Sequence, residues 1–334
     1  MSVRRETLEL HTARPFGIAR WTHSTYPRTF VTFESGGVTG RGEAAPNAYY
    51  GETVATVAAV LPLLAGALTD GWDWDGLQER LGARMPGGHP SVKCALETAA
   101  VEWAASSAGV PVWRRLGLSP APILESSFTV GLGPLEDMRR EAREAVARGH
   151  GVLKVKLGTN EDEAILEALR EEAPGVALRV DANAAWTRPQ VRRMLGVLDA
   201  ARVELLEQPL AAGDLEGHAE LRRLSSLPLA ADESLHRVPD VPRLAGAFDG
   251  VNLKLAKLGG AAAGAGGRAA GPGAMMGCMI ESSRGIAAAH LAGLCDGADL
   301  DGALLLGDDP FTGLEWQAGR LARPTGVGWG VEWR

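Results

Sequence analysis

The feature that most constrains the fold of this chain is a regular alternation of short apolar runs with stretches of helical periodicity. The apolar runs occupy residues 151–157, 176–183, 203–210, 227–234, 250–257, 273–282 and 298–306. Strands that are buried on both faces of a sheet have such continuous apolar sequences, and strands that alternate with helices pair in parallel. With residues 127–130 as an additional first strand, the sequence predicts eight parallel strands.

Eight strand–helix units favour a closed barrel over an open sheet. An open doubly wound sheet is the alternative, but it normally has a glycine-rich phosphate-binding loop after its first strand. Residues 131–134 read only Gly-Leu-Gly-Pro. We therefore predict an α/β fold, a modified TIM barrel of the (β/α)7β type, over residues 123–315.

The first 122 residues have a different pattern. Residues 29–33 alternate and are followed by glycine-rich turns, which indicates antiparallel strands. Apolar residues recur at three- and four-residue steps over 91–108, which indicates a helix with one buried face. We predict an α+β capping domain over residues 1–122 that is completed by residues 316–334.

Composition and charge exclude several classes of protein. No apolar run approaches the roughly 20 residues that span a bilayer. The N-terminus lacks the apolar segment of a secretory signal, so we expect a cytoplasmic protein. The net charge of −7 comes without basic blocks. We therefore expect neither a nucleic acid nor a membrane as a partner.

Polar residues stand in or just after each apolar run from the second strand onward. They are Lys154, Lys156, Asp181, Asn183, Glu207, Asp232, Glu233, Lys254, Glu281, Asp299 and Asp301. Counted from Lys156, the successive strand positions are 25, 26, 25, 22, 27 and 18 residues apart, about one strand–helix unit per step. Barrel enzymes carry their sites where the strands end, so these side chains should form a ring there. So many crowded charges must compensate one another or hold a metal.

Three acidic residues of this ring form a candidate metal site. Asp181, Glu207 and Asp232 belong to three consecutive strands and supply anionic oxygen ligands, with no cysteine or histidine among them. Such a ligand set favours Mg²⁺, or Mn²⁺, over zinc.

The lysines of the ring indicate proton transfer. Lys154 and Lys156 are two residues apart on one strand, so both side chains point into the barrel. Two ammonium groups beside a divalent cation should lower the pKa of at least one of them, which makes a lysine a usable base. Lys254, four strands further on, would stand across the barrel. Two bases on opposite sides of a carbon acid suit racemisation or epimerisation beside a carboxylate, with the metal stabilising the enediolate.

These motifs resemble the enolase superfamily, specifically its muconate lactonizing enzyme branch. The resemblance extends over nearly the whole chain, through the segments EAAPNAYYGET, SVKCALETA, LKVKLG, RVDAN, LLEQPL, ADES, VNLKLAKLGG, GCMIESS and GVGWGVEW. It implies that Lys156 and Lys254 are the acid/base pair, that Lys154 helps to hold the substrate carboxylate, and that the three acidic residues bind Mg²⁺. Lysine or histidine bases that work with Mg²⁺ are a known pattern of this superfamily.

The last strand narrows the implied activity. Asp299 and Asp301 resemble the DxD motif by which dipeptide epimerases hold the α-ammonium group, and two carboxylates of the same strand parity suit an ammonium. The resemblance implies epimerisation of an L-Ala-Xaa dipeptide at the α-carbon of its C-terminal residue. We also expect Glu281 to contact the substrate, and Asn183 and Glu233 to support the metal ligands.

The chain departs from the Ala-Glu epimerase pattern in the residues that would set specificity. Arg20 is not where such epimerases tend to place the arginine that holds a side-chain carboxylate, and Trp21 stands there instead. Tyr49 and Tyr50 could line an aromatic or apolar pocket. In addition, the segment 259–273 should supply the helix after the Lys254 strand, but it is about one turn short and rich in glycine.

Other titratable residues are expected to lie outside the site. We interpret His218 and His236 as surface residues of a helix or loop, and His290 as a core residue of an apolar helix. Lys257, three residues past Lys254, is interpreted as a surface residue.

Several alternative functions remain open. o-Succinylbenzoate synthase, N-acylamino acid racemase and a lactone-forming cycloisomerase resemble this chain in metal ligands and lysines, but they have no need of an ammonium site. A non-catalytic carboxylate-binding or structural protein on the same scaffold is a further alternative. We expect a small-molecule substrate and a homo-oligomer, as is usual among relatives.

Overall fold

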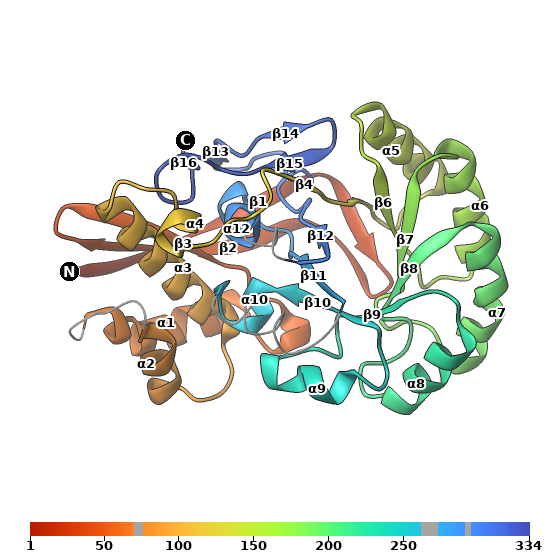
Figure 1. The fold of residues 1–334 in the computed structure, drawn as a ribbon, viewed down its shortest axis with the longest axis horizontal. Helices are drawn as coiled ribbons and strands as arrows, with labels where there is room; N and C mark the ends of the chain where they lie inside the picture. The colour runs from red at the N-terminus through yellow and green to blue at the C-terminus, as the bar shows by residue number, and fades with distance from the viewer. Residues whose placement is uncertain (70–75, 262–272, 291–294) are drawn as a thin grey trace.

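The computed structural model describes residues 1–69, 76–261, 273–290 and 295–334. Figure 1 shows two parts side by side along the long axis, with the N-terminal strands and helices at one end and the regular strand–helix units at the other. Among the described residues, no helix has the length and apolar character needed to cross a bilayer. The predicted helix within 259–273 lies for the most part outside the described residues.

Eight parallel strands form the barrel in the order of the sequence. They are β5 (Phe128–Val130), β6 (Val152–Lys156), β7 (Ala177–Asp181), β8 (Val203–Glu207), β9 (Leu229–Ala231), β10 (Gly250–Lys254), β11 (Ala274–Gly277) and β12 (Gly297–Asp299). The two edges of this sheet meet, because the backbone N–H of Ser127 donates to the carbonyl of Ala298 at 3.2 Å. The predicted TIM-like barrel is therefore confirmed.

Helices cover the outside of the barrel. The longer ones are α5 (Leu135–Ala147), α6 (Asp162–Glu172), α7 (Arg188–Ala200) and α8 (Leu215–Leu224); the shorter ones are α9 (Val241–Leu244), which follows the 3₁₀ turn η2 (Val238–Asp240), α10 (Leu255–Leu258) and α12 (Ser283–Ala289). Helix α7 begins at a capping box, in which Thr187 and Gln190 each satisfy a backbone N–H of the other. Ile165, Leu166 and Leu169 of α6 are buried, as their spacing predicts.

The N-terminal part is an antiparallel sheet with helices on one face. Its strands are β1 (Ser2–Ile18), β2 (Trp21–Ser35) and β3 (Val38–Ala44), followed by the 3₁₀ turn η1 (Ala48–Tyr50) and helices α1 (Val54–Thr69), α2 (Leu77–Arg84) and α3 (Pro90–Ser107). Helix α3 lies so close to β3 that a Cβ at Gly40 or Gly42 would stand about 2 Å from a helix carbonyl oxygen, 2.0 Å for Ala99 and 1.8 Å for Ala95. The predicted antiparallel α+β cap is thus confirmed.

The C-terminal residues pack against both parts. The small C-terminal elements are β13 (Phe311–Thr312), β14 (Trp316–Gln317), β15 (Arg320–Ala322) and β16 (Glu332–Trp333). Strand β15 pairs with β4 (Ile123–Glu125), which follows the short helix α4 (Val112–Arg115) ahead of the first barrel strand. The Trp329 indole N–H donates to the carbonyl of Thr98 in α3 at 3.1 Å, and the Trp333 ring lies 5.1 Å from that of Phe30 in β2. The domain boundaries at residues 122 and 315 stay a prediction.

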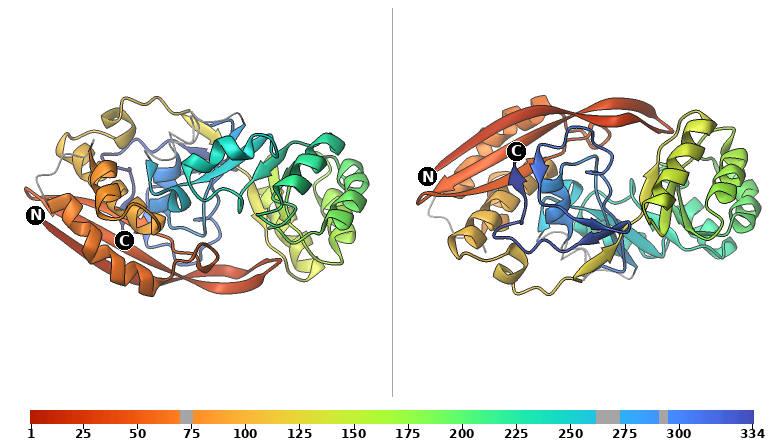
Figure 2. Two further views of the ribbon diagram at one scale, coloured as in Figure 1. Left: turned by 90° about the horizontal axis from the view of Figure 1, so that it is seen from below. Right: turned by 90° about the horizontal axis from the view of Figure 1, so that it is seen from above.

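The hairpin of β1 and β2 brings the cap to the mouth of the barrel. Figure 2 shows this long ribbon running from the cap to the strand–helix units. It is fixed to the barrel by backbone hydrogen bonds: Ala13 N–H donates to Leu305 O at 2.9 Å, and Leu132 N–H donates to Gly17 O at 2.8 Å. The turn of the hairpin, where Arg20 lies, is therefore held over the strand ends.

Candidate active site at the barrel mouth

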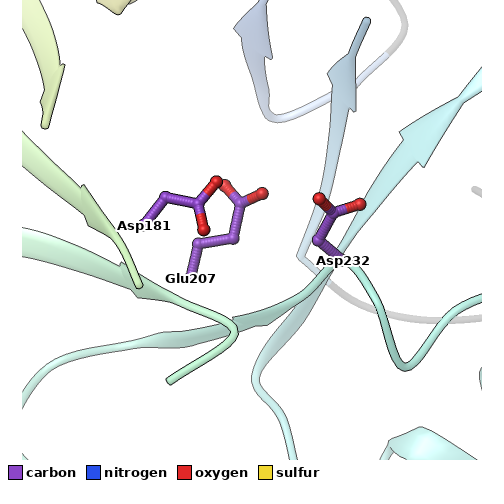
Figure 3. Close-up of side chains that lie close together, drawn as sticks. All are labelled: Asp181, Glu207 and Asp232. Carbon is purple, nitrogen blue, oxygen red and sulfur yellow. The ribbon is translucent and has the colours of Figure 1, made fainter. Parts of the chain in front are cut away.

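Three buried carboxylates converge where consecutive strands end. Asp181 and Glu207 are the last residues of β7 and β8, and Asp232 directly follows β9. One oxygen from each lies within 4.8 Å of the others, and Figure 3 shows the three side chains pointing toward a common space. Parallel strands that end at the same level produce this convergence, as the sequence spacing predicts. An all-oxygen anionic set of this kind fits Mg²⁺ or Mn²⁺.

Each carboxylate turns one oxygen toward a lysine of the barrel interior. Lys156 Nζ donates to Asp181 Oδ2 at 2.6 Å, and Lys254 Nζ donates to Asp232 Oδ2 at 2.9 Å. Lys154 Nζ lies 2.9 Å from Glu207 Oε2. Because β6 and β10 are four strands apart in the eight-stranded barrel, Lys156 and Lys254 stand on opposite sides of it.

The other oxygen of each carboxylate is held by a donor from the scaffold. The backbone N–H of Asn183 donates to Asp181 Oδ1 at 2.8 Å, and Asn252 Nδ2 donates to Glu207 Oε1 at 2.9 Å. Lys257 Nζ donates to Asp232 Oδ1 at 2.5 Å. All three carboxylates are therefore fixed from behind, which is how metal ligands are commonly oriented.

The electrostatics of the site follow from burial and from the lysines. Burial raises the pKa of Glu207 to about 7 although Lys154 lowers it. Burial also opposes ionisation of Asp181, but Lys156 and Lys154 outweigh it and hold its pKa below the ordinary value. The ammonium groups thus stabilise the charged form of Asp181, whereas at Glu207 burial has the larger effect.

The expected lowering of a lysine pKa is not found for Lys154. Burial lowers the pKa of this lysine, but the carboxylates of Asp299, Glu207 and Asp181 outweigh burial and raise it well above its ordinary value. The prediction counted the neighbouring ammonium and a cation but not the number of carboxylates around Lys154. A divalent cation bound to these carboxylates would offset the same charge.

The two aspartates of the last strand lie beside Lys154. Asp299 ends β12, accepts from Lys154 Nζ at 2.7 Å through Oδ2 and from Ser127 Oγ at 2.7 Å through Oδ1. Asp301 lies beyond the strand and accepts from the backbone N–H of Thr129 at 2.5 Å. Burial, together with Asp299, raises the pKa of Asp301 to about 7. Both carboxylates face the same cavity.

That cavity has a volume of about 330 Å³ between the barrel and the cap. The barrel contributes most of its charged lining, with Lys154, Lys156, Asn183, Asp232, Glu233, Lys254, Asp299 and Asp301. The cap adds the polar residues Arg20, His23, Thr25, Arg28 and Asn47. Its apolar and aromatic lining includes Phe16, Ile18, Trp21, Tyr26, Tyr49 and Tyr50 from the cap, and Met279, Ile280 and Leu305 from segments that follow barrel strands. The cavity therefore has a charged floor, and its roof combines aromatic and apolar side chains with a few polar ones.

Arg20 reaches this cavity but is already paired. Its Nη2 donates to Glu233 Oε1 at 2.7 Å, and its Nη1 donates to the carbonyl of Asn183. The guanidinium also lies 4.4 Å from the centre of the Tyr49 ring and 5.0 Å from that of Trp21. Asn183 Nδ2 donates to the same oxygen of Glu233 at 3.2 Å, so the hairpin turn and the strand ends form one network.

Two interpretations of titratable residues are wrong. Lys257 is not on the surface: its side chain is 1% exposed and bonds Asp232, because it belongs to a helix that begins at the strand end rather than to a loop. His218 is also buried; its Nδ1 contacts Asp214 O at 2.8 Å and its Nε2 accepts from the backbone N–H of Leu210. The reason is that the amphipathic face of α8 turns this residue inward.

The expectations for the two remaining histidines agree with the structure, and that for Glu281 is tested only for burial. His236 is exposed, and His290 is buried in the core. Glu281 is buried, but its Oε2 accepts from the backbone N–H of Met279 at 2.9 Å, and it is not among the residues that line the cavity. A direct contact of Glu281 with a substrate stays a prediction.

Three supporting residues were missed by reasoning from the sequence: Lys257, Asn252 and Gln208. Gln208 Oε1 accepts from the backbone N–H groups of Asp232 and Ser234, both at 3.0 Å, and so fixes the third ligand. Two signals were available. Asn252 precedes Lys254 by two residues and shares its strand face. The chain has only five lysines among 34 lysine and arginine residues, and four of the five lie in this site.

Comparison with known proteins places the chain among enzymes of one family. The family model described as enolase C-terminal domain-like matches residues 137–334. The chain is 36% identical to the hydrophobic dipeptide epimerase of Roseobacter litoralis over 336 residues, which covers 96% of this chain and 95% of that protein. It is 33% identical to the L-Ala-D/L-Glu epimerase of Escherichia coli, with 96% of this chain and 98% of that protein covered.

A solved structure gives the same result for the fold. The dipeptide epimerase from Enterococcus faecalis, determined as a complex with Mg and the dipeptide L-Leu-L-Tyr, superposes with a TM-score of 0.92. The sequence identity is 29%, and 98% of each chain is covered.

Proposed function

The chain belongs to the enolase superfamily and is an isomerase, and from this premise we propose that it is a Mg²⁺-dependent dipeptide epimerase. It would invert the α-carbon of the C-terminal residue of an L-Ala-Xaa-type dipeptide. The single observation that carries the proposal is the position of Lys156 and Lys254 on opposite sides of one cavity, with a carboxylate triad between them.

The triad would hold the cation. Asp181, Glu207 and Asp232 offer three anionic oxygens in a buried site, which suits Mg²⁺ and also Mn²⁺. When bound, the cation would stabilise negative charge that develops on the substrate carboxylate. Lys154, whose ammonium lies among these carboxylates and Asp299, is positioned to help hold the same substrate group.

The two lysines would move the proton. One would take the α-proton from one face of the substrate carbon, and the other would return a proton to the opposite face, which inverts the centre by a 1,1-proton transfer through an enediolate. Both are held to the ends of barrel strands, and each already lies within 3 Å of a triad carboxylate, at 2.6 Å for Lys156 and 2.9 Å for Lys254. Because the fold already holds both bases in position, the reaction does not have to lose the entropy of bringing them together.

The ammonium group of a dipeptide would bind between Asp299 and Asp301. These two carboxylates line the cavity and differ in their partners: Asp299 is paired with the ammonium of Lys154, whereas Asp301 accepts from a backbone N–H. The aspartate pair argues against o-succinylbenzoate synthase and N-acylamino acid racemase, whose substrates have no free ammonium. These stay the alternatives.

We propose that the epimerised residue has an apolar side chain. Arg20 is paired with Glu233, and the other arginine of the cavity, Arg28, is buried and donates to the carbonyls of Ile280 and Pro27. An acidic side chain would therefore have to compete with these partners, whereas the aromatic roof suits an apolar group. The relative named as a hydrophobic dipeptide epimerase agrees with this choice.

A dipeptide library tests the proposed function. In D₂O with Mg²⁺, the enzyme should exchange the α-proton of the C-terminal residue of L-Ala-L-Xaa dipeptides, observed by NMR, with faster exchange for Leu, Met or Phe than for Glu or Lys. The matched control is the same library after removal of the metal with a chelator. Absence of deuterium uptake together with turnover of an elimination substrate would contradict the proposal.

A further inference from the structure

The three triad carboxylates share one arrangement, in which an inner oxygen faces the lysines of the barrel and an outer oxygen is held from behind. For Asp181 and Glu207 the outer donor is neutral, a backbone N–H and the Asn252 amide. For Asp232 the outer donor is the ammonium of Lys257. The donor behind Asp232 is thus the one charged member of the set.

Lys257 holds Asp232 at two points. Its Nζ donates to the side-chain Oδ1 at 2.5 Å and to the main-chain carbonyl of Asp232 at 2.8 Å. The two bonds fix both the rotation of the carboxylate and the backbone from which it projects. Asp232 Oδ2 then faces Lys254 and the cavity, and Gln208 holds the backbone N–H of the same residue.

The local fold explains how a residue beyond the strand reaches this point. Strand β10 ends at Lys254 and α10 begins at once, so the one helical turn carries Lys257 back over the strand end. The helix ends at Gly259, whose φ of 95° is a left-handed conformation that favours glycine. Helix α10 packs on α3 of the cap, which excludes water from the lysine.

Lys257 does not line the cavity, so it cannot touch a substrate there. Its ammonium lies 5.6 Å from the centre of the Tyr50 ring, and that ring does line the cavity. Lys257 therefore stands between a metal-ligand candidate on the barrel and an aromatic residue on the cap. Its position is that of a support rather than of an acid or base.

We propose that Lys257 is a positioning residue for the metal site, one that keeps Asp232 oriented to bind a divalent cation. This inference rests on the proposed function only in requiring that the triad binds the cation; it does not depend on the substrate. Two effects of Lys257 oppose each other. Its charge repels a cation, whereas its hydrogen bonds orient the ligand. The proposal is that orientation has the larger effect.

The sign of a change in cation affinity separates these effects. We compare Lys257→Met, which has neither charge nor donor, with Lys257→Gln, which is equally uncharged but keeps an amide donor. Mg²⁺ binding is measured by titration calorimetry on the metal-free protein. We expect Lys257→Met to bind Mg²⁺ about 10- to 100-fold more weakly than the wild type, with Lys257→Gln in between.

Unchanged or tighter Mg²⁺ binding in Lys257→Met, or equal affinity in the Met and Gln variants, would overturn the proposal. Melting curves without metal identify folded protein; if Lys257→Met does not fold, weaker Mg²⁺ binding by Lys257→Gln than by the wild type is the required result. The control is Lys93→Met, a lysine of α3 beside Gly259 that bonds Met85 O, and it should leave the affinity unchanged. A wild type that binds no Mg²⁺ would instead refute the metal in the proposed function.

Discussion

The two sides of the site are built on the same plan with different residues. On β6, Lys154 and Lys156 are two residues apart; on β10, Asn252 and Lys254 are two apart. In both pairs the second residue is a lysine bonded to a flanking aspartate, Asp181 or Asp232, and the first residue contacts Glu207 between them. Lys154 approaches Glu207 Oε2 and Asn252 donates to Oε1, each at 2.9 Å.

The two sides differ in the position of the lysine that accompanies the proposed base. On the β6 side the additional lysine, Lys154, precedes the proposed base and faces the carboxylates of Glu207 and Asp299. On the β10 side the additional lysine, Lys257, follows the proposed base by three residues and lies behind Asp232. The β6 side therefore concentrates positive charge toward the cavity, and the β10 side uses it to hold a ligand. Each side thus has two lysines, but the lysine that accompanies the proposed base has a different role on each side.

Of the variants considered, Lys154→Met should lower the stability of the protein most. It leaves three buried carboxylates, those of Asp181, Glu207 and Asp299, without their shared cation. Losing one partner of a buried charge pair costs about 3–5 kcal/mol, so the free energy of unfolding should fall by about that amount in urea denaturation without metal. Added Mg²⁺ should recover more stability in the variant than in the wild type. A loss below about 1 kcal/mol would contradict the assigned charge balance.

Asn252→Leu, the matched change on the β10 side, should have a smaller effect. It removes a neutral donor and leaves Glu207 Oε1 buried without that bond, which costs about 1–3 kcal/mol. The same urea experiment measures it. If the two variants lose equal stability, the two sides do not differ in charge as described.

Asp301→Asn should have the smallest effect on the protein itself and should act on substrate binding. The change keeps size but removes charge, so we expect the KM for a dipeptide to rise about tenfold with Mg²⁺ affinity unchanged. Because burial raises the pKa of Asp301 to about 7, the wild type should lose the carboxylate charge as the pH falls below 7. Its KM should therefore rise between pH 8 and pH 6, and the Asn variant should lack that rise. Equal loss of metal binding would mean that Asp301 is wrongly assigned.

Much of the fold and of the site could be predicted from the sequence because both depend on periods within a strand or a strand–helix unit. The repeat of about 25 residues gives the barrel, and strand parity gives the shared direction of Lys154 and Lys156. Lys257 could not be placed in this way, because the chain changes from strand to helix between it and Lys254. The parity of a strand does not extend across that boundary.

Contacts between residues that are far apart in the chain could likewise not be predicted from the sequence. Arg20 and Glu233 are far apart in the chain and meet only because the hairpin turn reaches the barrel mouth. His218 is a different case: it precedes Leu221 by three residues and shares the buried face of α8, so the helical period was a signal for its burial. The raised pKa of Lys154 depends on how many carboxylates surround its ammonium, and only the folded structure shows that number.

The central claim, that Lys156 and Lys254 act on opposite faces of one carbon, has a direct test. Lys156→Met and Lys254→Met are incubated separately in D₂O with Mg²⁺ and each diastereomer of an Ala-Leu dipeptide, and deuterium uptake is followed by NMR. Each variant should lose epimerisation but keep exchange from one diastereomer, and the two variants should keep opposite ones. Exchange retained from the same diastereomer in both variants would contradict the account.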